Sequence, residues 1–269
     1  MSTKKRDIPV FDLPIIETHC HLDYLKERPL ADTLDNARKV NIERIITIAV
    51  TPDNLATVRE LSQAAPWVYG TQGIHPHDAE LYTAAVEAEI RQHSADPKIV
   101  AIGEIGLDYF YDNSDRRVQR EVFRQQLQIA CDTRLPVVIH SREADEDTIA
   151  ILQEFEHSLP RRGVIHSFTS GPELARYAID QGWRLGFNGI ATFNKAENVR
   201  DIIRMTPIEQ ILLETDAPFL TPVPYRGKEN APHYLPFIAE QVAAVKQLGI
   251  DEVLQATYQA SLATFFPAG

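Results

Sequence analysis

The feature of this sequence that most constrains its fold is a repeated alternation of short apolar runs with longer helical patterns. The runs are rich in Ile, Val and Leu and are mostly apolar on both faces, which is typical of parallel strands covered on both sides. Eight such strands are predicted at 14–18, 44–50, 67–73, 99–104, 136–140, 163–166, 183–187 and 210–215. Amphipathic helices are predicted at 115–133, 143–157, 172–181, 196–205 and 234–247.

Eight β units alternating with helices in 269 residues predict an α/β protein, specifically a closed (β/α)8 TIM barrel. The alternative is an open, doubly wound sheet, which would usually carry a glycine-rich phosphate loop after its first strand. The chain instead reads ETHCH at 17–21, without a glycine. We expect one barrel domain over 15–269, preceded by an N-terminal extension over 1–14.

Charge and cysteine content narrow the function classes. Lys and Arg number 27 and Asp and Glu number 38, so the net charge of −11 argues against a broad basic face that wraps nucleic acid. A small local site for phosphate remains compatible with this charge. Cys20 and Cys131 form no Cys-x-x-Cys pair, and no run approaches the ~20 apolar residues of a membrane helix. We expect a cytoplasmic protein that does not bind membranes, and no protein partner can be inferred.

The N-terminal extension carries a short basic run. Lys4, Lys5 and Arg6 could contact nucleic acid, although such a segment is more often a disordered tail. Charged residues and prolines interrupt the stretch from Asp7 to Pro14, so it has no continuous apolar segment of the kind found in signal peptides.

The predicted strands end in residue types that bind metals. In a barrel these strand ends converge on one mouth, where active sites lie. The candidate metal ligands are His19, His21, Glu104, His140, His166 and Asp216. Four histidines and two carboxylates are too many for one tetrahedral zinc ion and suit two divalent ions.

The spacing and chemistry of these residues favour metal-dependent hydrolysis. His19 and His21 are two residues apart, so on an extended segment both side chains point to one side. Glu104 has two carboxylate oxygens and can bridge two ions. A metal-bound hydroxide would then be the nucleophile, and Asp216 would accept the proton and return it to the leaving group. Glu104 and Asp216 are therefore the predicted catalytic residues, and the positive site suits an anionic ester such as a phosphodiester.

Each of these residues also has a purely structural interpretation. His-x-His occurs in ordinary turns, and a buried Glu104 could instead pair with an arginine. His140 and His166 could be hydrogen-bonded core residues, and Asp216 could cap a helix. His75, Arg142 and Arg226 are weaker candidates, predicted to contact substrate from loops at the mouth. Arg142 could instead simply pair with Glu143, and any surface loop can carry a basic residue such as Arg226.

Seven motifs, in order along the chain, resemble the TatD family of metal-dependent hydrolases within the amidohydrolase-like barrels. They are ETHCHLD at 17–23, GIHPH at 73–77, GEIGLDY at 103–109, PVVIHSR at 136–142, GVIHSF at 163–168, LETDAP at 213–218 and PYRGKEN at 224–230. The family usually has Asp at the position of Glu17 and Cys at the position of Ser167. Neither position belongs to the candidate metal ligands.

The resemblance implies a specific ligand set and activity. One ion would be held by His19, His21, Glu104 and Asp216, and a second by Glu104, His140 and His166. It implies a deoxyribonuclease, in particular a 3′-to-5′ exonuclease on single-stranded DNA or on RNA. The metal could be Mg²⁺, Mn²⁺ or Zn²⁺.

The alternative function is hydrolysis of a small ester, amide or lactone, which the same barrel and ligands can support. Many small-amide hydrolases of the wider superfamily use a carboxylated lysine as the bridge, and no lysine lies at a predicted strand end here. A non-catalytic binding protein is disfavoured because all six ligand positions are filled.

Overall fold

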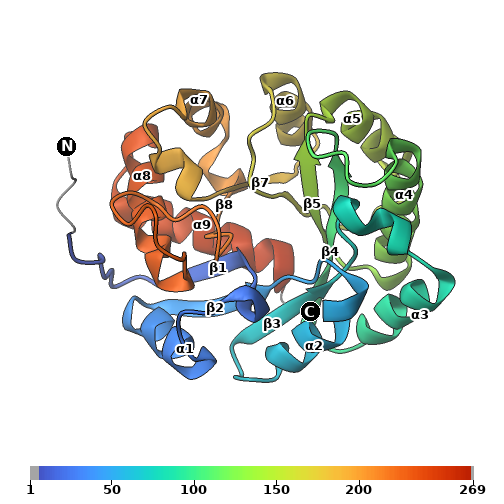
Figure 1. Cartoon of the computed structure of the whole chain (residues 1–269). Coiled ribbons are helices and arrows are strands. Elements are labelled where there is room, and N and C mark those ends of the chain that lie inside the picture. Colours follow the sequence, from blue (N-terminus) through green and yellow to red (C-terminus); the bar gives the residue numbers. More distant parts are fainter. Residues whose placement is uncertain (1–5, 268–269) are drawn as a thin grey trace.

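The computed structural model describes residues 6–267 and arranges all eight predicted strands in one parallel sheet, in chain order. The strands are β1 (Ile15–Cys20), β2 (Ile42–Thr47), β3 (Val68–Gln72), β4 (Ile99–Asp108), β5 (Val137–Arg142), β6 (Val164–Ile165), β7 (Arg184–Phe187) and β8 (Ile211–Leu213). Figure 1 looks along the resulting barrel, which confirms the predicted (β/α)8 architecture.

Helices surround the barrel and separate its strands (Figure 1). They are α1 (Leu30–Lys39), α2 (Leu55–Ser62), α3 (Ala84–His93), α4 (Arg116–Thr133), α5 (Asp145–Glu154), α6 (Pro172–Asp180), α7 (Glu197–Met205), α8 (Leu235–Lys246) and α9 (Ile250–Phe265). The five predicted helices correspond to α4–α8. None of the helices between residues 6 and 267 combines the length and apolarity needed to cross a membrane.

Alternating strand residues build two apolar layers. Ile45 packs in the larger layer between strands and helices, whereas its neighbour Ile46 packs inside the barrel. The inner cluster also contains Ala260 and Phe265 of α9, so this last helix covers the end of the barrel opposite the strands' C-terminal ends. Both faces of the strands are thus buried, which explains why their sequences are apolar almost throughout.

Strand β4 runs four residues beyond its predicted end and carries two polar residues, Glu104 and Asp108, toward the mouth. Its pairing with β5 shifts between Ile102 and Ile105, after which Gly106 lies opposite His140. Gly106 has φ +138°, and a Cβ there would lie 2.0 Å from the His140 carbonyl oxygen. Only glycine permits this close approach of β4 to the histidine on β5.

The barrel closes where its first and last strands meet, and side chains of β1 form much of this seam. Thr18 Oγ1 donates to the carbonyl of Leu213, 2.9 Å away. The buried Glu17 carboxylate accepts from the backbone N–H of Thr215 at 2.9 Å and from that of His19 at 3.1 Å. Glu17 thus joins the two ends of the sheet just below the mouth.

Candidate metal centre

Glu104 is the hub of a buried cluster at the mouth. Its Oε1 lies 2.7 Å from His166 Nε2, 3.1 Å from His140 Nδ1 and 3.3 Å from His75 Nε2. Its Oε2 faces the other way and lies 3.4 Å from His19 Nε2. The two oxygens of this carboxylate therefore contact different imidazoles.

Asp216 completes the side of the cluster that contains β1. Its Oδ1 lies 3.4 Å from His21 Nε2 and 3.6 Å from His19 Nε2. The backbone of Asp216 has φ +59°, and its N–H donates to the His19 carbonyl at 2.9 Å. His21 N–H in turn donates to the Ala217 carbonyl at 2.7 Å. This left-handed turn, which Asp tolerates better than most residues, directs the carboxylate toward the two histidines.

The two-residue spacing of His19 and His21 directs both side chains to the same side of the chain, as the sequence predicted. Their rings lie 5.2 Å apart at 77°, with both Nε2 atoms near Asp216 Oδ1. Cys20 points the other way, and its Sγ contacts the Ile46 carbonyl at 3.7 Å. His19 also stacks on His166, with ring centroids 3.9 Å apart.

Asp108 supports the cluster from behind. Its Oδ2 lies 3.0 Å from His140 Nε2 and 3.0 Å from His77 Nε2, and its Oδ1 accepts from the backbone N–H groups of Phe110 and Tyr111. His140 therefore has one ring nitrogen on Asp108 and the other facing Glu104. Such a carboxylate–histidine pair fixes the tautomer and the direction of a metal-binding nitrogen.

Glu214 plays the corresponding part behind His166. Its buried Oε1 accepts from Ser167 N–H at 2.6 Å and Asn188 Nδ2 at 3.2 Å, and lies 3.7 Å from His166 Nδ1. A Cβ on Gly186 would lie only 2.4 Å from Glu214 Oε2, so glycine is required beside it.

Helix α4 holds two of these loops through glutamines on its buried face. Gln119 binds both the N–H and the carbonyl of Asp108, at 2.9 and 3.1 Å. Gln126, two turns later, binds the N–H and carbonyl of Ile74 at 2.7 and 3.0 Å, next to His75. Because both glutamines lie on one face of a single helix, their hydrogen bonds fix the backbone at Asp108 and the backbone next to His75 relative to each other.

The electrostatics of the cluster centre on an ionised carboxylate. Burial would raise the pKa of Glu104, but the charge of His166 and the hydrogen bonds from His140 and His166 hold it well below its usual range. Against its own burial, contacts with Glu104 raise the pKa of His166 well above its usual value. Burial lowers the pKa of His75 to about 4, and burial together with the His166 charge lowers that of His19. His75 and His19 thus present neutral imidazoles.

These residues fit a divalent cation. Both ring nitrogens of buried His19 lack a hydrogen-bond partner among the described residues, as does Nδ1 of His166. Two groups of potential ligand atoms gather on Glu104, one with His19 and His21 and one with His75 and His140. Neutral imidazole nitrogens combined with carboxylate oxygens are a donor set for zinc, manganese and similar ions.

The structure places the predicted substrate-contacting residues in different positions. His75 lies inside the cluster, against Glu104, rather than in a peripheral loop. Arg142 lies at the rim, with its guanidinium 4.0 Å from the Phe110 ring centroid and 4.8 Å from that of Tyr111. Arg226 is exposed and stacks on Phe193, 3.7 Å from its ring centroid.

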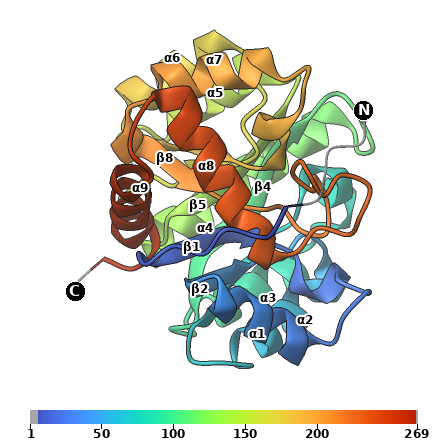
Figure 2. The ribbon, with the colours of Figure 1, turned by 90° about the vertical axis from the view of Figure 1, so that its left-hand side faces the viewer.

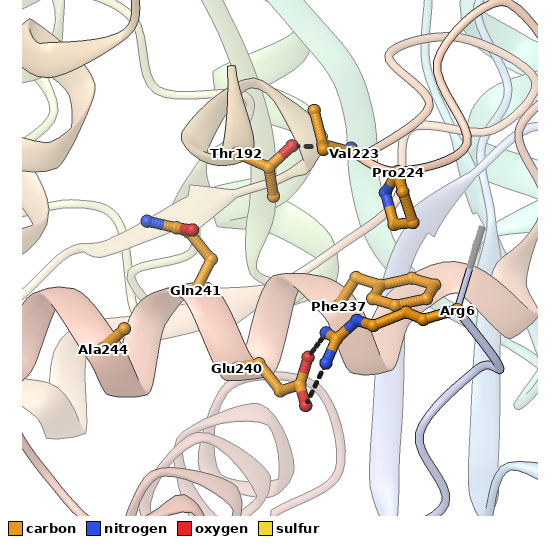
Figure 3. Close-up of a pocket in the computed structure, with 8 residues that line it drawn as sticks. All are labelled: Arg6, Thr192, Val223, Pro224, Phe237, Glu240, Gln241 and Ala244. Carbon is orange, nitrogen blue, oxygen red and sulfur yellow. Dashed lines mark hydrogen bonds and ion pairs between the residues drawn. The ribbon is translucent and has the colours of Figure 1, made fainter. Parts of the chain in front are cut away.

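Of the predicted basic run, Lys4 and Lys5 lie outside the described residues. Arg6 forms an ion pair with Glu240 of α8 and lies over the Phe237 ring (Figure 3). These contacts border a cavity of about 450 Å³ between α8 and the proline-rich segment after β8. The charge of Arg6 is thus already neutralised by a neighbouring carboxylate.

Sequence reasoning missed the central position of His75 and the role of Glu17 in the seam. The first could have been found, because His75 lies three residues after β3, at the same end of the barrel as His166, which directly follows β6. The second left no pattern, since a polar residue near the start of a strand does not reveal which backbone groups it will meet.

Comparisons with known proteins agree with this geometry. Residues 16–266 match the family model described as TatD related DNase. The chain is 36% identical to the uncharacterized metal-dependent hydrolase YabD of Bacillus subtilis, over 90% of this chain and 95% of the relative. It is also 36% identical to the uncharacterized metal-dependent hydrolase YcfH of Escherichia coli K12, over 90% and 92%.

A solved structure extends the similarity to three dimensions. The crystal structure of YjjV, a TatD homologue from Escherichia coli K12, superposes with a TM-score of 0.88 at 29% identity, covering 94% of this chain and 98% of that one. The family model, the relatives and the structure all span nearly the whole barrel. The chain therefore belongs to the TatD family of metal-dependent hydrolases.

Proposed function

We propose that this protein uses two divalent ions at the mouth to hydrolyse phosphodiester bonds at the 3′ ends of single-stranded DNA, and of RNA. The observation that carries the proposal is that the two oxygens of Glu104 contact different histidines. One ion would be held by His19, His21, Glu104 and Asp216, whose side chains lie together around Glu104 Oε2 and Asp216 Oδ1. A second ion would be held by Glu104, His140 and His166, and His75 lies against the same carboxylate oxygen, Glu104 Oε1.

The ions supply the electrophilic part of the chemistry. When bound, divalent ions polarise a phosphoryl oxygen and lower the pKa of water toward neutrality. The mixed nitrogen and oxygen donors suit Zn²⁺ and Mn²⁺, and Mg²⁺ remains a candidate because two of the ligands are carboxylates.

Asp216 is the proposed proton carrier. Burial would raise the pKa of Asp216, but the hydrogen bond from His21 and the neighbouring histidine charges lower it, so the carboxylate is ionised at neutral pH. Its side chain is 14% exposed, against 4% for Glu104. Asp216 can therefore accept a proton from water at the solvent side and return it to the leaving oxygen, whereas Glu104 is enclosed and holds the centre together.

Exposed aromatic side chains at the mouth support a nucleic-acid substrate. Phe110 and Tyr111 follow β4 and are 50% and 54% exposed, and Phe219 follows β8 and is 51% exposed. Phe219 lies 6.1 Å from the His21 ring, and Arg142 stacks on the other two. Bases of a single strand stack on such rings without regard to sequence, and an arginine can meet the phosphates.

The proposal is tested by digestion of single-stranded DNA labelled at its 5′ end. Metal-stripped protein receives Mg²⁺, Mn²⁺ or Zn²⁺, and the Asp216→Asn variant is prepared in parallel. Glu143→Gln serves as the matched control, because Glu143 is an exposed carboxylate at the same mouth that contacts none of the cluster. We expect stepwise loss of 3′ nucleotides with wild type and Glu143→Gln, and a loss of about 100-fold or more in rate with Asp216→Asn.

Other outcomes would count against the proposal. Equal slow digestion by all three proteins identifies a contaminating nuclease. Absence of digestion despite stoichiometric metal binding contradicts the nuclease assignment and favours a small ester, amide or lactone as substrate.

A further inference from the structure

A second cluster of charged side chains lies at the end of the barrel opposite the mouth. Arg161 and Arg162 lie in the loop between α5 and β6, and Arg184 begins β7. With Gly182, Ala263 and Thr264 they line a cavity of about 180 Å³, here called the arginine pocket. In Figure 2 the end of α9, where Ala263 and Thr264 lie, is on the left, and the loop after β8, at the mouth, is on the right.

The three arginines have no ion-pair partner among residues 6–267. Their five side-chain hydrogen bonds all end on backbone carbonyls. Arg162 uses three nitrogens in this way and fastens the loop. Arg161 donates only to the Thr264 carbonyl, and Arg184 only to that of Gly182, so most of their N–H groups remain available.

Arg184 is the arginine of the pocket whose hydrogen-bonding capacity is least satisfied. Its Nε is buried and has no hydrogen-bond partner within the described part of the chain. Burial lowers the pKa of both Arg184 and Arg161, and Glu209 is the carboxylate whose charge acts against this for Arg184. A guanidinium stays protonated even so, so the positive charge is retained at a cost in hydration.

The size of the pocket limits its ligand. Its volume corresponds to about six water molecules at roughly 30 Å³ each, below the ~300 Å³ of a typical cofactor pocket. A tetrahedral oxyanion fits such a space, and a nucleoside does not. Guanidinium groups match phosphate oxygens with paired N–H donors, and an anion would offset the repulsion among three like charges.

We propose that the arginine pocket is a binding site for a phosphate group, either inorganic phosphate or the terminal group of a phosphomonoester. The site is separate from the metal centre, since its residues lie at the opposite ends of the strands. It does not depend on the proposed nuclease activity.

Calorimetric titration of inorganic phosphate into the metal-loaded protein tests this proposal. The variants are Arg184→Gln and, as matched control, Arg176→Gln, which alters an exposed arginine of nearby α6 that has no ion pair within the described chain. We expect wild type and Arg176→Gln to share a phosphate-binding event that Arg184→Gln weakens at least tenfold, with DNA digestion unchanged in all three. Phosphate binding that is identical in Arg184→Gln places all of it elsewhere and overturns the proposal.

A second variant keeps the proposal testable if Arg184→Gln fails to fold. Ala263→Glu places a carboxylate on the exposed rim of the pocket. We expect it to raise the melting temperature in phosphate-free buffer and to abolish the further rise that phosphate gives wild type. A melting temperature that still rises with phosphate as in wild type contradicts the proposal.

Parallel titrations distinguish the two phosphate sources. Glycerol 3-phosphate is the monoester probe, and its binding is compared with that of inorganic phosphate in wild type and Arg184→Gln. Arginine-dependent binding of the monoester that is tenfold tighter identifies a phosphomonoester, and the reverse preference identifies free phosphate. Failure of both probes to bind through Arg184 overturns the proposal.

Discussion

At the mouth of the barrel, Glu104, Asp108 and Glu214 are buried among histidines, whereas at the opposite end Arg161 and Arg184 border a pocket in which the described chain supplies no carboxylate partner. The mouth also contains left-handed residues, such as Asp216, that direct side chains inward. The opposite end is held by hydrogen bonds from arginines to helix-end carbonyls.

Chain direction accounts for much of this difference. Each strand runs toward the mouth and the following helix runs back, so helix N-termini lie at the mouth and helix C-termini at the opposite end. Unpaired carbonyls at helix C-termini favour cations, as Arg162 illustrates beside the ends of α5 and α6. Unpaired N–H groups at the mouth favour buried carboxylates and anionic substrates. The fold thus favours buried carboxylates at the mouth and arginines at the opposite end.

The largest expected effect comes from removing the carboxylate that defines the mouth. Glu104→Gln keeps the size of the side chain but removes the charge that its contacts with four imidazoles depend on. We expect kcat/KM for DNA to fall by about 100- to 1,000-fold or more and bound metal, measured by mass spectrometry, to drop. Phosphate binding in the arginine pocket should persist. If Glu104→Gln kept an activity close to that of the control variant Glu143→Gln, the Glu104 carboxylate would not be needed for the reaction.

A change at the seam should alter how stability depends on pH. Burial raises the pKa of Glu17 to about 8, against the hydrogen bonds from Thr215 and His19. The folded state therefore keeps a proton that the unfolded state releases above its ordinary pKa of 4.5, so this contribution is complete below that pH and is lost as pH rises through about 8. It amounts to at most about 5 kcal/mol.

Urea unfolding of metal-stripped protein between pH 5 and 9 measures this effect. Glu17→Gln retains the acceptor for both N–H groups, so we expect its unfolding free energy to be flatter with pH and to exceed that of wild type at pH 9. Parallel curves for the two proteins would mean that Glu17 does not titrate in this range. Arginines at the opposite end remain charged throughout and leave the comparison undisturbed.

Asp108→Asn tests how rigidly the mouth is held. The amide still reaches His140 but no longer favours the tautomer that directs Nδ1 to Glu104. We expect a 10- to 100-fold loss in metal affinity, measured by competition with a chelating dye, with kcat largely restored at saturating metal. His77→Gln removes the other imidazole on Asp108 and should have the smaller effect. A fall in kcat that metal cannot restore would contradict a positioning role.

The smallest expected effect concerns the aromatic rim. Phe110→Ala should raise KM for single-stranded DNA about five- to tenfold, near the lower end of the energy of one base stack. Hydrolysis of bis(p-nitrophenyl) phosphate, which has no stacked strand, should not change. Leu81→Ala alters an equally exposed apolar residue as control. Equal KM changes for both substrates would show that Phe110 supports the site rather than the strand.

Much of this architecture could be predicted from sequence because it depends on local patterns. The apolar runs in the sequence identified the strands. The polar residues at the ends of these runs lie together in the structure, as the contacts of Glu104 with His140 and His166 show. Helices α1, α2, α3 and α9 were not among the five that were predicted. The role of Glu17 was missed because it depends on a contact with Thr215, 198 residues away in the chain. The arginine pocket also joins three distant segments, none of which is unusual by itself.

The seam also determines which parts of the chain must be in place before the site is complete. His19 and His21 enter with the first strand, and Asp216 enters after the last, with the Glu17–Thr215 contact spanning 198 residues between them. Glu104, His140 and His166 lie on or directly after β4, β5 and β6, whereas the histidines at the end of β1 meet a residue that follows β8, Asp216. The proposed metal centre is therefore complete only when the first and last strands have met at the seam.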